Sequence, residues 1–458
     1  MTQTTTYHLV GAGGIGMSAI ARLLLARGAR ISGSDVARTP LIDALEAAGM
    51  RTAIGHRASN IGDAEVVVVS SAIAVDNPEL MAALAAKRSV LTRGQMLARL
   101  AEGQRVIAVA GTHGKTTTTA MLASIFEEAG FDPTVAVGGI RVGAESNARP
   151  GGGTWFVTES DESDGSFLHL HPTIAVVTNI ENDHIASDEE LPKLLADFAQ
   201  FVAKVPPGGR AVIGTDNRAS ALIAKQANAP VTTFGVHTPA DLTAEGITYA
   251  ALGSRFMVFE LGTPLGEVEL RVPGEINVAN TLAAIGAARA VGITFAPIVR
   301  ALAGFGGVRR RFELVARGAL TVIDDYAHHP TAIAATIAAA RDFAGGAPVL
   351  VAFQPHRYTR TEYLKADFAQ ALGAADHVFL TPVYAASEKP IPGVSERSIG
   401  ELLAGAGTPV TYVSEVDALL EAIPREAPAG ALVLMLGAGS ISNVAHRLGE
   451  RLTGALVR

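Results

Sequence analysis

The chain has 458 residues, of which 48% are hydrophobic and 18% are charged, and it carries a net charge of −7 with no cysteine. About three domains are expected, because a single core rarely organises more than about 250 residues. The net negative charge argues against a nucleic-acid partner, because binding the phosphates of a nucleic acid needs a basic surface. The absence of cysteine excludes disulfides, thiolate metal sites and cysteine nucleophiles.

The N-terminus has no basic segment followed by an apolar one, so no export signal is expected. The most apolar runs, Val66–Val69 and Leu432–Leu436, are far shorter than the ~20 residues that a membrane helix needs. They are typical of buried strands in a parallel sheet. We therefore expect a cytoplasmic protein without membrane contact. A monomer or a homodimer is expected, although these features do not bear on that choice.

Short apolar runs alternate with alanine- and leucine-rich helical stretches, which is typical of an α/β fold. Three strands, Tyr7–Val10, Arg105–Ala110 and Thr321–Ile323, each lead into a loop and a helix. Polar residues 102–104 and the glycine- and arginine-rich residues 304–311 separate them. The predicted domains are therefore residues 1–104, 105–311 and 312–458. Within the second, residues 231–272 show short alternating strands, at 256–261 and 267–272, and predict a β-rich flap.

The first strand leads into a glycine loop. Gly11, Gly13 and Gly16 fit the pattern G-x-G-x-x-G, and Asp35 follows about 20 residues later. That pattern alone would suit an NAD-dependent dehydrogenase, or glycines needed only for close packing. Because NAD does not explain the second loop described next, we favour another pyrophosphate here, such as that of a UDP-sugar.

The second strand leads into the most informative loop. Its glycines let backbone N–H groups surround phosphate oxygens at the start of a helix. Lys115 would bind the β- and γ-phosphates of ATP, and Thr116 would bind Mg²⁺. The common Gly-x4-Gly-Lys-Ser/Thr pattern is broken by Val109, and the alternative is a solvated turn. The predicted ATP-binding residues of this loop are Gly111, Thr112, His113, Gly114, Lys115, Thr116 and Thr117.

An acidic segment follows the predicted strand 154–158. Glu159 ends that strand, where a carboxylate commonly holds Mg²⁺ beside a phosphate loop. We expect Asp161 and Glu162 to belong to a solvated acidic loop. His184 follows the strand 174–178, and by itself it would more often be a surface histidine than a ligand.

Asn277 and Asn280 share one face of a predicted helix, where they suit either an adenine edge or a helix cap. In the last third, Asp325, Tyr326, His328 and His329 follow one strand. His356, Arg357 and Arg360 follow another strand, 349–353. Ligands bind outside the carboxyl ends of such strands, and arginines and histidines there suit a carboxylate and an acyl phosphate. The alternative is a solvated surface.

Together these motifs resemble the UDP-N-acetylmuramate–L-alanine ligase family, a branch of the Mur ligases, over essentially the whole chain. The matching segments are 8–18, 33–35, 70–73, 159–167, 353–361 and 437–441. Segment 353–361, Phe-Gln-Pro-His-Arg-Tyr-Thr-Arg-Thr, is the most specific. Segment 324–333 also resembles a related recycling ligase that attaches a whole tripeptide, which is the alternative.

The resemblance implies a three-domain Mur ligase architecture. An N-terminal Rossmann-like domain would hold UDP-N-acetylmuramate, a central P-loop ATPase-like domain would hold ATP and Mg²⁺, and a C-terminal Rossmann-like domain would bring L-alanine. The implied reaction is ATP-dependent ligation through an acyl phosphate, with ADP and phosphate as products, in peptidoglycan precursor synthesis for the cell wall.

The resemblance also assigns roles to individual residues. The UDP-sugar would contact Gly11, Gly13, Gly14, Gly16, Met17, Asp35, Ser70, Ser71 and Arg93. Beyond the phosphate loop, ATP would contact Asn277, Asn280, Arg311 and Asp325. The alanine pocket would comprise Tyr326, His328, His356, Arg357 and Arg360. The metal ligands would be Thr116, Glu159 and His184, and the catalytic residues Lys115, Glu159, His184, His328 and Arg357. The amine of L-alanine must lose a proton in the implied reaction, and either His328 or His329 could accept it.

Three positions depart from the family pattern. Ile276 stands where a histidine is usual, so one polar contact to the nucleotide is expected to be replaced by apolar packing. Residues 185–187 lack an expected aspartate, and Ser440 replaces another. The lysine, the metal carboxylate and the pocket arginines are all retained.

Overall fold

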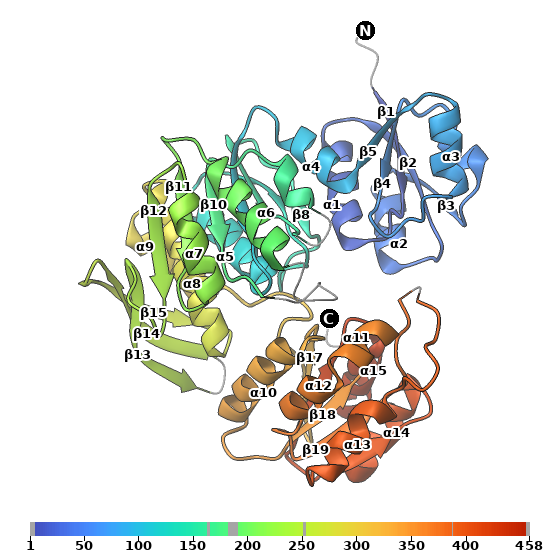
Figure 1. Ribbon diagram of the computed structural model, residues 1–458, viewed down its shortest axis with the longest axis vertical. Helices are drawn as coiled ribbons and strands as arrows, with labels where there is room; N and C mark the ends of the chain where they lie inside the picture. Colours follow the sequence, from blue (N-terminus) through green and yellow to red (C-terminus); the bar gives the residue numbers. More distant parts are fainter. Residues whose placement is uncertain (1–4, 163–164, 182–190, 251–252, 387, 455–458) are drawn as a thin grey trace. The chain divides into compact units, whose positions relative to one another are not determined.

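The computed structural model describes residues 5–162, 165–181, 191–250, 253–386 and 388–454. Their strands form three sheets of five, ten and six strands, coloured from blue to red in Figure 1. The chain divides into two compact units. One comprises residues 1–244, 258–266 and 279–302, and the other comprises 245–257, 267–278 and 303–458. Among the described residues, no helix is long and apolar enough to cross a membrane.

The first sheet has the strand order β3-β2-β1-β4-β5, and every neighbouring pair is parallel. Its elements are β1 (Thr6–Val10), α1 (Ile15–Ala26), β2 (Arg30–Asp35), α2 (Pro40–Ala47), β3 (Arg51–Ile54), η1 (Ala58–Ile61), β4 (Val66–Val69), α3 (Pro78–Ala85), β5 (Ser89–Thr92) and α4 (Arg93–Ala101).

Alternating side chains of these strands supply two cores. Leu9 and Val68 pack in one cluster with residues of α1, α2 and α4, whereas Val10 and Val69 pack with Ala83 of α3. This alternation follows from the two-residue period of a strand. Figure 1 shows α1 and α3 on opposite sides of the sheet. Parallel strands covered on both faces explain why Val66–Val69 is continuously apolar.

The central sheet has the order β15-β14-β13-β12-β11-β10-β6-β9-β7-β8. Its strands are β6 (Arg105–Ala110), β7 (Thr134–Ala136), β8 (Ala148–Arg149), β9 (Trp155–Glu159), β10 (Ile174–Val177), β11 (Arg210–Gly214), β12 (Val231–Gly235), β13 (Leu242–Ala250), β14 (Gly253–Glu260) and β15 (Thr263–Leu270). Its helices are α5 (Lys115–Glu128), η2 (Ser166–His169), α6 (Leu191–Ala203), α7 (Arg218–Ile223), η4 (Ala224–Gln226), α8 (Glu275–Ala290) and α9 (Phe295–Gly304).

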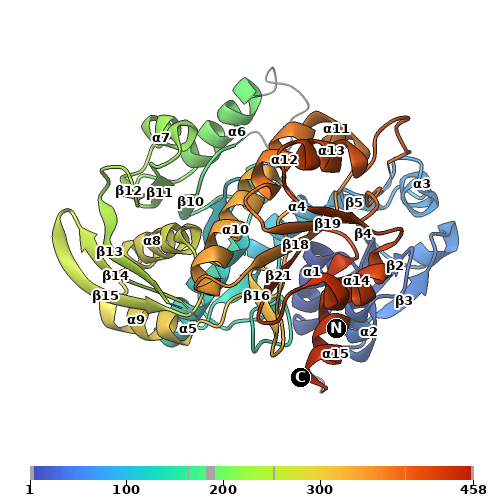
Figure 2. The same cartoon turned by 90° about the horizontal axis from the view of Figure 1, so that it is seen from below.

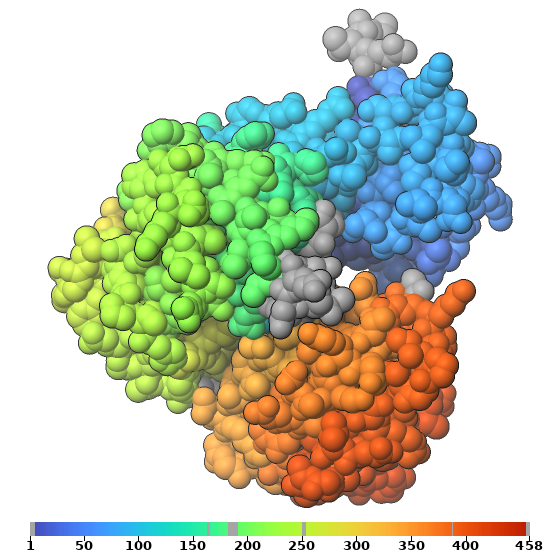
Figure 3. Space-filling view, viewed as in Figure 1, coloured from blue at the N-terminus to red at the C-terminus, as the bar shows by residue number. Residues whose placement is uncertain are grey.

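The cores of the first two sheets are continuous. Met17 of α1, Ala108 of β6 and Phe198 of α6 belong to one cluster of buried residues. Phe167 of η2 packs on Phe198 with ring centroids 5.1 Å apart. In Figure 3 the blue N-terminal surface and the cyan to green central surface adjoin. Residues from the N-terminal sheet and from the central sheet can therefore contribute to one site.

The predicted β-rich flap is confirmed in part. The expected strands at 256–261 and 267–272 correspond to β14 and β15, which are joined by a tight turn at Leu261 and Gly262, both with positive φ (51° and 75°). Residues 231–235 do not belong to a flap, because β12 pairs in parallel with β11 in the main sheet. Residues 231–235 are compatible both with a strand of the main parallel sheet and with a strand of the flap. The periodicity of so short a segment therefore did not distinguish the two positions.

The third sheet has the order β16-β17-β21-β18-β19-β20, parallel except for the edge strand β16. Its elements are β16 (Glu313–Arg317), β17 (Thr321–Asp325), α10 (Pro330–Ala344), β18 (Val349–Phe353), α11 (Tyr358–Tyr363), α12 (Lys365–Leu372), β19 (His377–Leu380), α13 (Arg397–Gly405), β20 (Val410–Tyr412), η5 (Val416–Ala418), α14 (Leu419–Glu426), β21 (Leu432–Leu436) and α15 (Ile441–Thr453).

Helices cover both faces of this sheet. Val433 and Met435 pack with residues of α14 and α15, whereas Leu434 and Leu436 pack with residues of α10, α12 and α13. Figure 2 shows the two groups of helices on either side of β18 and β21. The strand β17 extends past the predicted Thr321–Ile323 and includes Asp325.

Candidate active site

The loop between β6 and α5 has the conformation of a phosphate-binding loop. Gly114 is left-handed, with φ 84°, and a Cβ there would overlap the Oδ1 atom of Asn280. The first intrahelical hydrogen bond runs from the Thr118 amide to the Gly114 carbonyl, at 2.9 Å. The amide groups of Lys115, Thr116 and Thr117 precede that bond, so they form the positive end of a 14-residue helix. This end can bind an anion.

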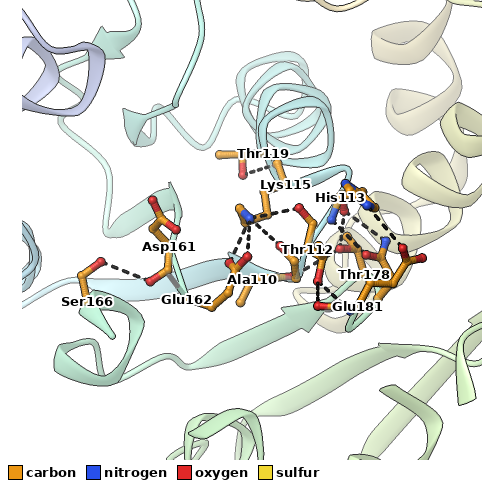
Figure 4. A network of polar contacts seen from close by, with 12 residues as sticks. Ala110, Thr112, His113, Lys115, Thr119, Asp161, Glu162, Ser166, Thr178 and Glu181 are labelled. Carbon is orange, nitrogen blue, oxygen red and sulfur yellow. Dashed lines mark hydrogen bonds and ion pairs between the residues drawn. The ribbon is translucent and has the colours of Figure 1, made fainter. Parts of the chain in front are cut away.

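The segment that follows β10 supports the loop from beneath. The Asn179 side chain accepts a hydrogen bond from the His113 amide at 2.9 Å and donates one to the His113 carbonyl at 3.1 Å. Thr178 donates to the same carbonyl at 2.6 Å, and the Glu181 amide donates to the Thr112 hydroxyl at 2.7 Å. Figure 4 shows Thr112, His113, Thr178 and Glu181 together. The sequence interpretation missed this support, although its position after a neighbouring parallel strand was a signal.

Lys115 folds back over the loop. Its Nζ donates to the carbonyl oxygens of Gly111 at 2.5 Å and Thr112 at 3.2 Å. It also contacts both carboxylate oxygens of Glu162, at 3.0 and 2.9 Å. Burial alone would lower the pKa of Lys115, but the carboxylates of Glu162 and Asp161 outweigh burial and raise it. The ammonium group is therefore charged at neutral pH.

The expectation of a solvated acidic loop is wrong for Glu162. Its side chain is only 3% exposed, whereas that of Asp161 is 39% exposed. Burial raises the pKa of Glu162, and the nearby Lys115 opposes that rise. A buried carboxylate needs a counter-ion, and the partner is 47 positions away in the sequence. No local pattern could have identified this pair.

Glu159 ends β9, as the sequence predicted. Its Oε2 atom is buried and has no hydrogen-bond partner among the described residues. The carboxylate lies so close to Gly138 that a Cβ there would overlap it. Thr116, at the start of α5, is 5% exposed. An unpaired carboxylate oxygen together with a threonine hydroxyl suits Mg²⁺, which prefers oxygen ligands. His184 lies outside the described residues.

The two predicted asparagines differ in their surroundings. Asn280 lies over the phosphate loop, where its Oδ1 accepts a hydrogen bond from the Thr118 hydroxyl at 3.3 Å. The Nδ2 atom of the Asn277 side chain donates to the Pro273 carbonyl at 2.7 Å, just before the start of its own helix. Ile276, which departs from the family pattern, is 36% exposed. The structure thus places Asn280 at the loop and gives Asn277 a local contact.

The first glycine loop is organised around Asp35. Its Oδ2 atom accepts a hydrogen bond from the Gly13 amide at 2.8 Å. Ser70, which follows β4, lies against Gly11, where a Cβ would be 3.1 Å from the Ser70 Cβ. The first bond within α1 runs from the Ser18 amide to Gly14 at 2.9 Å. The amides of residues 15–17 therefore precede it and form a second helix start suited to an anion.

Arg93, the first residue of α4, lies between the first glycine loop and the acidic segment after β9. A Cβ on Gly16 would lie 3.1 Å from its Cδ. Its guanidinium reaches Asp161 at 3.5 Å and Ser166 at 3.3 Å in the central segment. Two other predicted sugar-binding residues differ, since the Met17 side chain is buried in the core at 1% exposure and Ser71 is exposed. Met17 can therefore contribute only through its backbone.

In the third sheet, Asp325 is fixed by backbone groups. Its two oxygens accept hydrogen bonds from the amides of Phe312 at 2.6 Å and Ala327 at 2.7 Å. Burial raises the pKa of Asp325, although the charge of Arg311 opposes that rise. The guanidinium of Arg311 lies 5.0 Å from the ring centroid of Tyr326. Asp325 thus ties the start of the domain to the loop after β17.

The predicted alanine-pocket residues gather at the ends of β17 and β18. His328 lies between Tyr326 and His356, with ring centroids 4.9 and 5.7 Å away. His356 stacks on Tyr384, with centroids 5.6 Å apart. Burial, and then the charges of Arg360 and Arg357, lower the pKa of His356 to about 4. His356 is therefore neutral at pH 7.

Two local features shape this pocket. Arg357 has a left-handed backbone, with φ 70°, and its amide donates to the Tyr384 carbonyl at 2.8 Å. Gln354 donates to the Ser440 hydroxyl at 3.2 Å and accepts from the Ile441 amide at 3.1 Å. Ser440, which departs from the family pattern, therefore helps to join the end of β18 to the start of α15.

Three family models match successive parts of the chain. The Mur ligase family catalytic domain matches residues 6–105, the Mur ligase middle domain matches residues 109–288, and the Mur ligase glutamate ligase domain matches residues 310–439.

Individual proteins match over nearly the full length. A UDP-N-acetylmuramate–L-alanine ligase from Acidithiobacillus ferrooxidans is 46% identical over 444 residues, with 96% of each chain covered. A ligase of the same name from Geotalea uraniireducens is 43% identical, with 98% of each chain covered. Among solved structures, a UDP-N-acetylmuramate–alanine ligase from Thermotoga maritima matches with a TM-score of 0.85 at 30% identity, covering 98% of this chain and 99% of that one. A murein peptide ligase from Psychrobacter arcticus matches with a TM-score of 0.75 at 26% identity, covering 99% of this chain and 100% of that one.

Proposed function

The chain belongs to the Mur ligase family, and from that premise we propose that it joins L-alanine to UDP-N-acetylmuramate at the expense of ATP. This reaction would supply a peptidoglycan precursor in the cytoplasm, where ATP is available. The observation that carries the proposal is the full-length similarity to enzymes of that name, at 46% and 43% identity. The phosphate loop with its buried, charged Lys115 supports the use of ATP.

ATP would bind with its β- and γ-phosphates on the amides at the start of α5. Lys115 would then neutralise the terminal phosphate, and Asn280 lies beside the same loop. Thr116 and Glu159 would hold Mg²⁺, since the Glu159 Oε2 atom lacks a hydrogen-bond partner among the described residues. When bound, Mg²⁺ supplies charge neutralisation for phosphoryl transfer.

The first chemical step activates a carboxylate. One oxygen of the lactyl carboxylate attacks the γ-phosphorus of ATP, the bond from that phosphorus to the bridging oxygen breaks, and ADP leaves. The product is an acyl phosphate. Lys115 favours this step because its positive charge stabilises the charge on the transferring phosphoryl group.

The second step forms the amide. The amine nitrogen of L-alanine attacks the acyl carbon, a tetrahedral intermediate forms, and inorganic phosphate leaves with the electrons of the C–O bond. The nitrogen must lose a proton to a base. The Nδ1 atom of His328 lies 2.8 Å from the Tyr326 carbonyl. A carbonyl only accepts, so Nδ1 carries the hydrogen in the neutral ring and Nε2 has the lone pair.

We therefore assign His328, through Nε2, as the proton acceptor. His356 is less suitable, because its pKa of about 4 makes it a weak base. Arg357 and Arg360, which carry the positive charge beside His356, would bind the carboxylate of the amino acid.

The alternative is a ligase that attaches a tripeptide, since a murein peptide ligase shares the fold. The L-alanine ligase from Thermotoga maritima is the closer of these two structures, with a TM-score of 0.85 against 0.75. A competition assay that offers L-alanine and L-Ala-γ-D-Glu-meso-diaminopimelate together separates the two functions. Predominant addition of the tripeptide would replace the proposal with the alternative.

The proposal as a whole is tested by ATP hydrolysis or transfer in four mixtures. These contain the protein with ATP and Mg²⁺ alone, with UDP-N-acetylmuramate, with L-alanine, and with both. We expect the rate of ADP and phosphate release to be close to zero until both substrates are present. Rapid turnover without them would indicate a nucleotide-hydrolysing switch instead of a ligase.

A further inference from the structure

The acidic segment after β9 holds Glu162 against the phosphate loop. Phe167 anchors the segment in the core at 0% exposure. The Ser160 amide donates to the Val109 carbonyl at 2.8 Å, and the Phe167 amide donates to the Asp161 carbonyl at 3.2 Å. Arg93 holds Asp161 from the other side at 3.5 Å. Separate contacts therefore hold Ser160, Asp161 and Phe167, which are described residues near Glu162.

The ammonium group of Lys115 is enclosed in this arrangement. It is bonded to two loop carbonyls and to both oxygens of Glu162. The lysine side chain is 15% exposed and the glutamate side chain 3% exposed. Figure 4 shows Glu162 pointing at the ammonium group of Lys115. A doubly accepting, negatively charged group at about 3 Å is also what a terminal phosphate would offer to this lysine.

The carboxylate and a phosphate cannot both hold this position. Two negative groups that share one ammonium at such short range repel each other, and the repulsion is strong where water is excluded. A nucleotide that engages Lys115 through its terminal phosphate must therefore break the contact between Lys115 and Glu162. The free energy needed to break the contact between Lys115 and Glu162 makes the binding of ATP weaker.

We propose that Glu162 is the resting-state counter-ion of Lys115, a positioning residue that occupies the place of the terminal phosphate and gives way when ATP binds. This inference rests on the proposed function, because it takes ATP as the ligand of the loop. Glu162 keeps the lysine folded over the loop in the empty protein. It also competes with the phosphates of the nucleotide for the ammonium group.

The test is the equilibrium dissociation constant for ATP, measured by calorimetry in EDTA without UDP-N-acetylmuramate or L-alanine, so that no turnover occurs. We expect Glu162→Gln to bind ATP about fivefold more tightly than the unchanged protein, because a loss of roughly 1 kcal/mol of competition corresponds to that factor. AMP, which lacks the β- and γ-phosphates, should bind both proteins equally. Asp161→Asn removes one negative charge from the same segment and is the matched control. Its dissociation constant for ATP should stay within about twofold of the value for the unchanged protein.

A double-mutant cycle assigns the effect to the pair. In a Lys115→Met background, adding Glu162→Gln should raise ATP affinity by clearly less than the fivefold expected when Lys115 is present. Glu162→Asp moves the carboxylate away from Lys115 by the length of one methylene group, so this variant should also bind ATP more tightly. It replaces Glu162→Gln in the test if the glutamine variant does not fold. Unchanged or weaker ATP binding by the folded Glu162 variants overturns the inference. No ATP binding by the unchanged protein, either in EDTA or with Mg²⁺ present, would instead overturn the proposed function.

Discussion

The guanidinium of Arg93 lies 3.5 Å from the carboxylate of Asp161. The arginine begins α4, which packs on the first sheet, and the aspartate follows β9 in the central sheet, so this contact joins the N-terminal sheet to the acidic segment after β9. The side chain of Arg93 also covers Gly16 at the start of α1. Arg93 therefore lies beside the first glycine loop and contacts the acidic segment, and we expect it also to bind the proposed sugar nucleotide.

The first prediction concerns Arg93→Ala. We expect the KM for UDP-N-acetylmuramate to rise about tenfold or more, because a hydrogen bond to a charged group contributes roughly 1.5–3 kcal/mol. The dissociation constant for ATP should stay within about twofold. Steady-state kinetics and calorimetry measure the two effects. Arg99→Ala, an exposed position on the same helix, is the control, and an equal rise in that variant would contradict the assignment.

The second prediction separates catalysis from stability at Lys115. Lys115→Ala should lower kcat by about 100-fold or more. It should also lower the free energy of unfolding by about 3 kcal/mol, because Glu162 is left buried without its counter-ion. Adding Glu162→Gln should restore most of the stability but none of the activity. Urea denaturation measures the stability, and the rate of product formation measures the activity. If the Lys115→Ala single mutant keeps more than about a tenth of the rate, Lys115 does not have the proposed catalytic role.

The third prediction concerns the proton acceptor. In His328→Asn, the side-chain amide can still donate to the Tyr326 carbonyl, but the lone pair of Nε2 is gone. We expect kcat to fall about 100-fold. The acidic limb of the pH–rate profile, where the base becomes protonated, should disappear. Persistence of that limb at an unchanged position would assign the proton to another group.

The fourth prediction follows from a buried network in the first sheet. Glu79 is 0% exposed and accepts hydrogen bonds from Ser34 and Asn60 at 2.5 Å, with His8 at 3.2 Å. Burial alone would raise the pKa of Glu79, but these hydrogen bonds outweigh burial and lower it to about 2. A lowered pKa in the folded state contributes stability above the unfolded value of about 4.3, and that stability is lost as the pH falls toward 2.

Glu79→Gln should therefore lower the free energy of unfolding at pH 7 by about 2 kcal/mol. The difference from the unchanged protein should shrink as the pH falls from about 5 to 3. Urea midpoints at each pH measure it, with the exposed Glu65→Gln as control. A difference that does not vary with pH would contradict the assignment of the ionised carboxylate.

The sequence predicted much of the fold because the sheets are mostly parallel and buried. The runs Val66–Val69, Arg105–Ala110 and Val349–Phe353 coincide with β4, β6 and β18, since strands covered on both faces are apolar throughout and end at polar residues. The phosphate loop was predictable for a related reason. Glycine and lysine at fixed spacing before a helix have a specific backbone geometry, which Gly114 shows with its φ of 84°.

The features that the sequence did not predict depend on contacts between distant residues. Glu162 is buried because Lys115 lies beside it, and an acidic segment with four carboxylates gives no local sign of which one turns inward. The Asn179 side chain holds His113 across 66 positions. The parallel pairing of β12 with β11 likewise depends on the register of two separate strands. Such contacts follow from tertiary structure and not from periodicity.

The most direct test of the proposed ligation follows oxygen from the lactyl carboxylate. UDP-N-acetylmuramate labelled with heavy oxygen at that group is incubated with ATP, Mg²⁺ and L-alanine, and the products are weighed by mass spectrometry after one turnover. We expect an L-alanyl amide that has lost one labelled oxygen, with that oxygen in inorganic phosphate and none in ADP. Label in AMP, or absence of the amide, would contradict it.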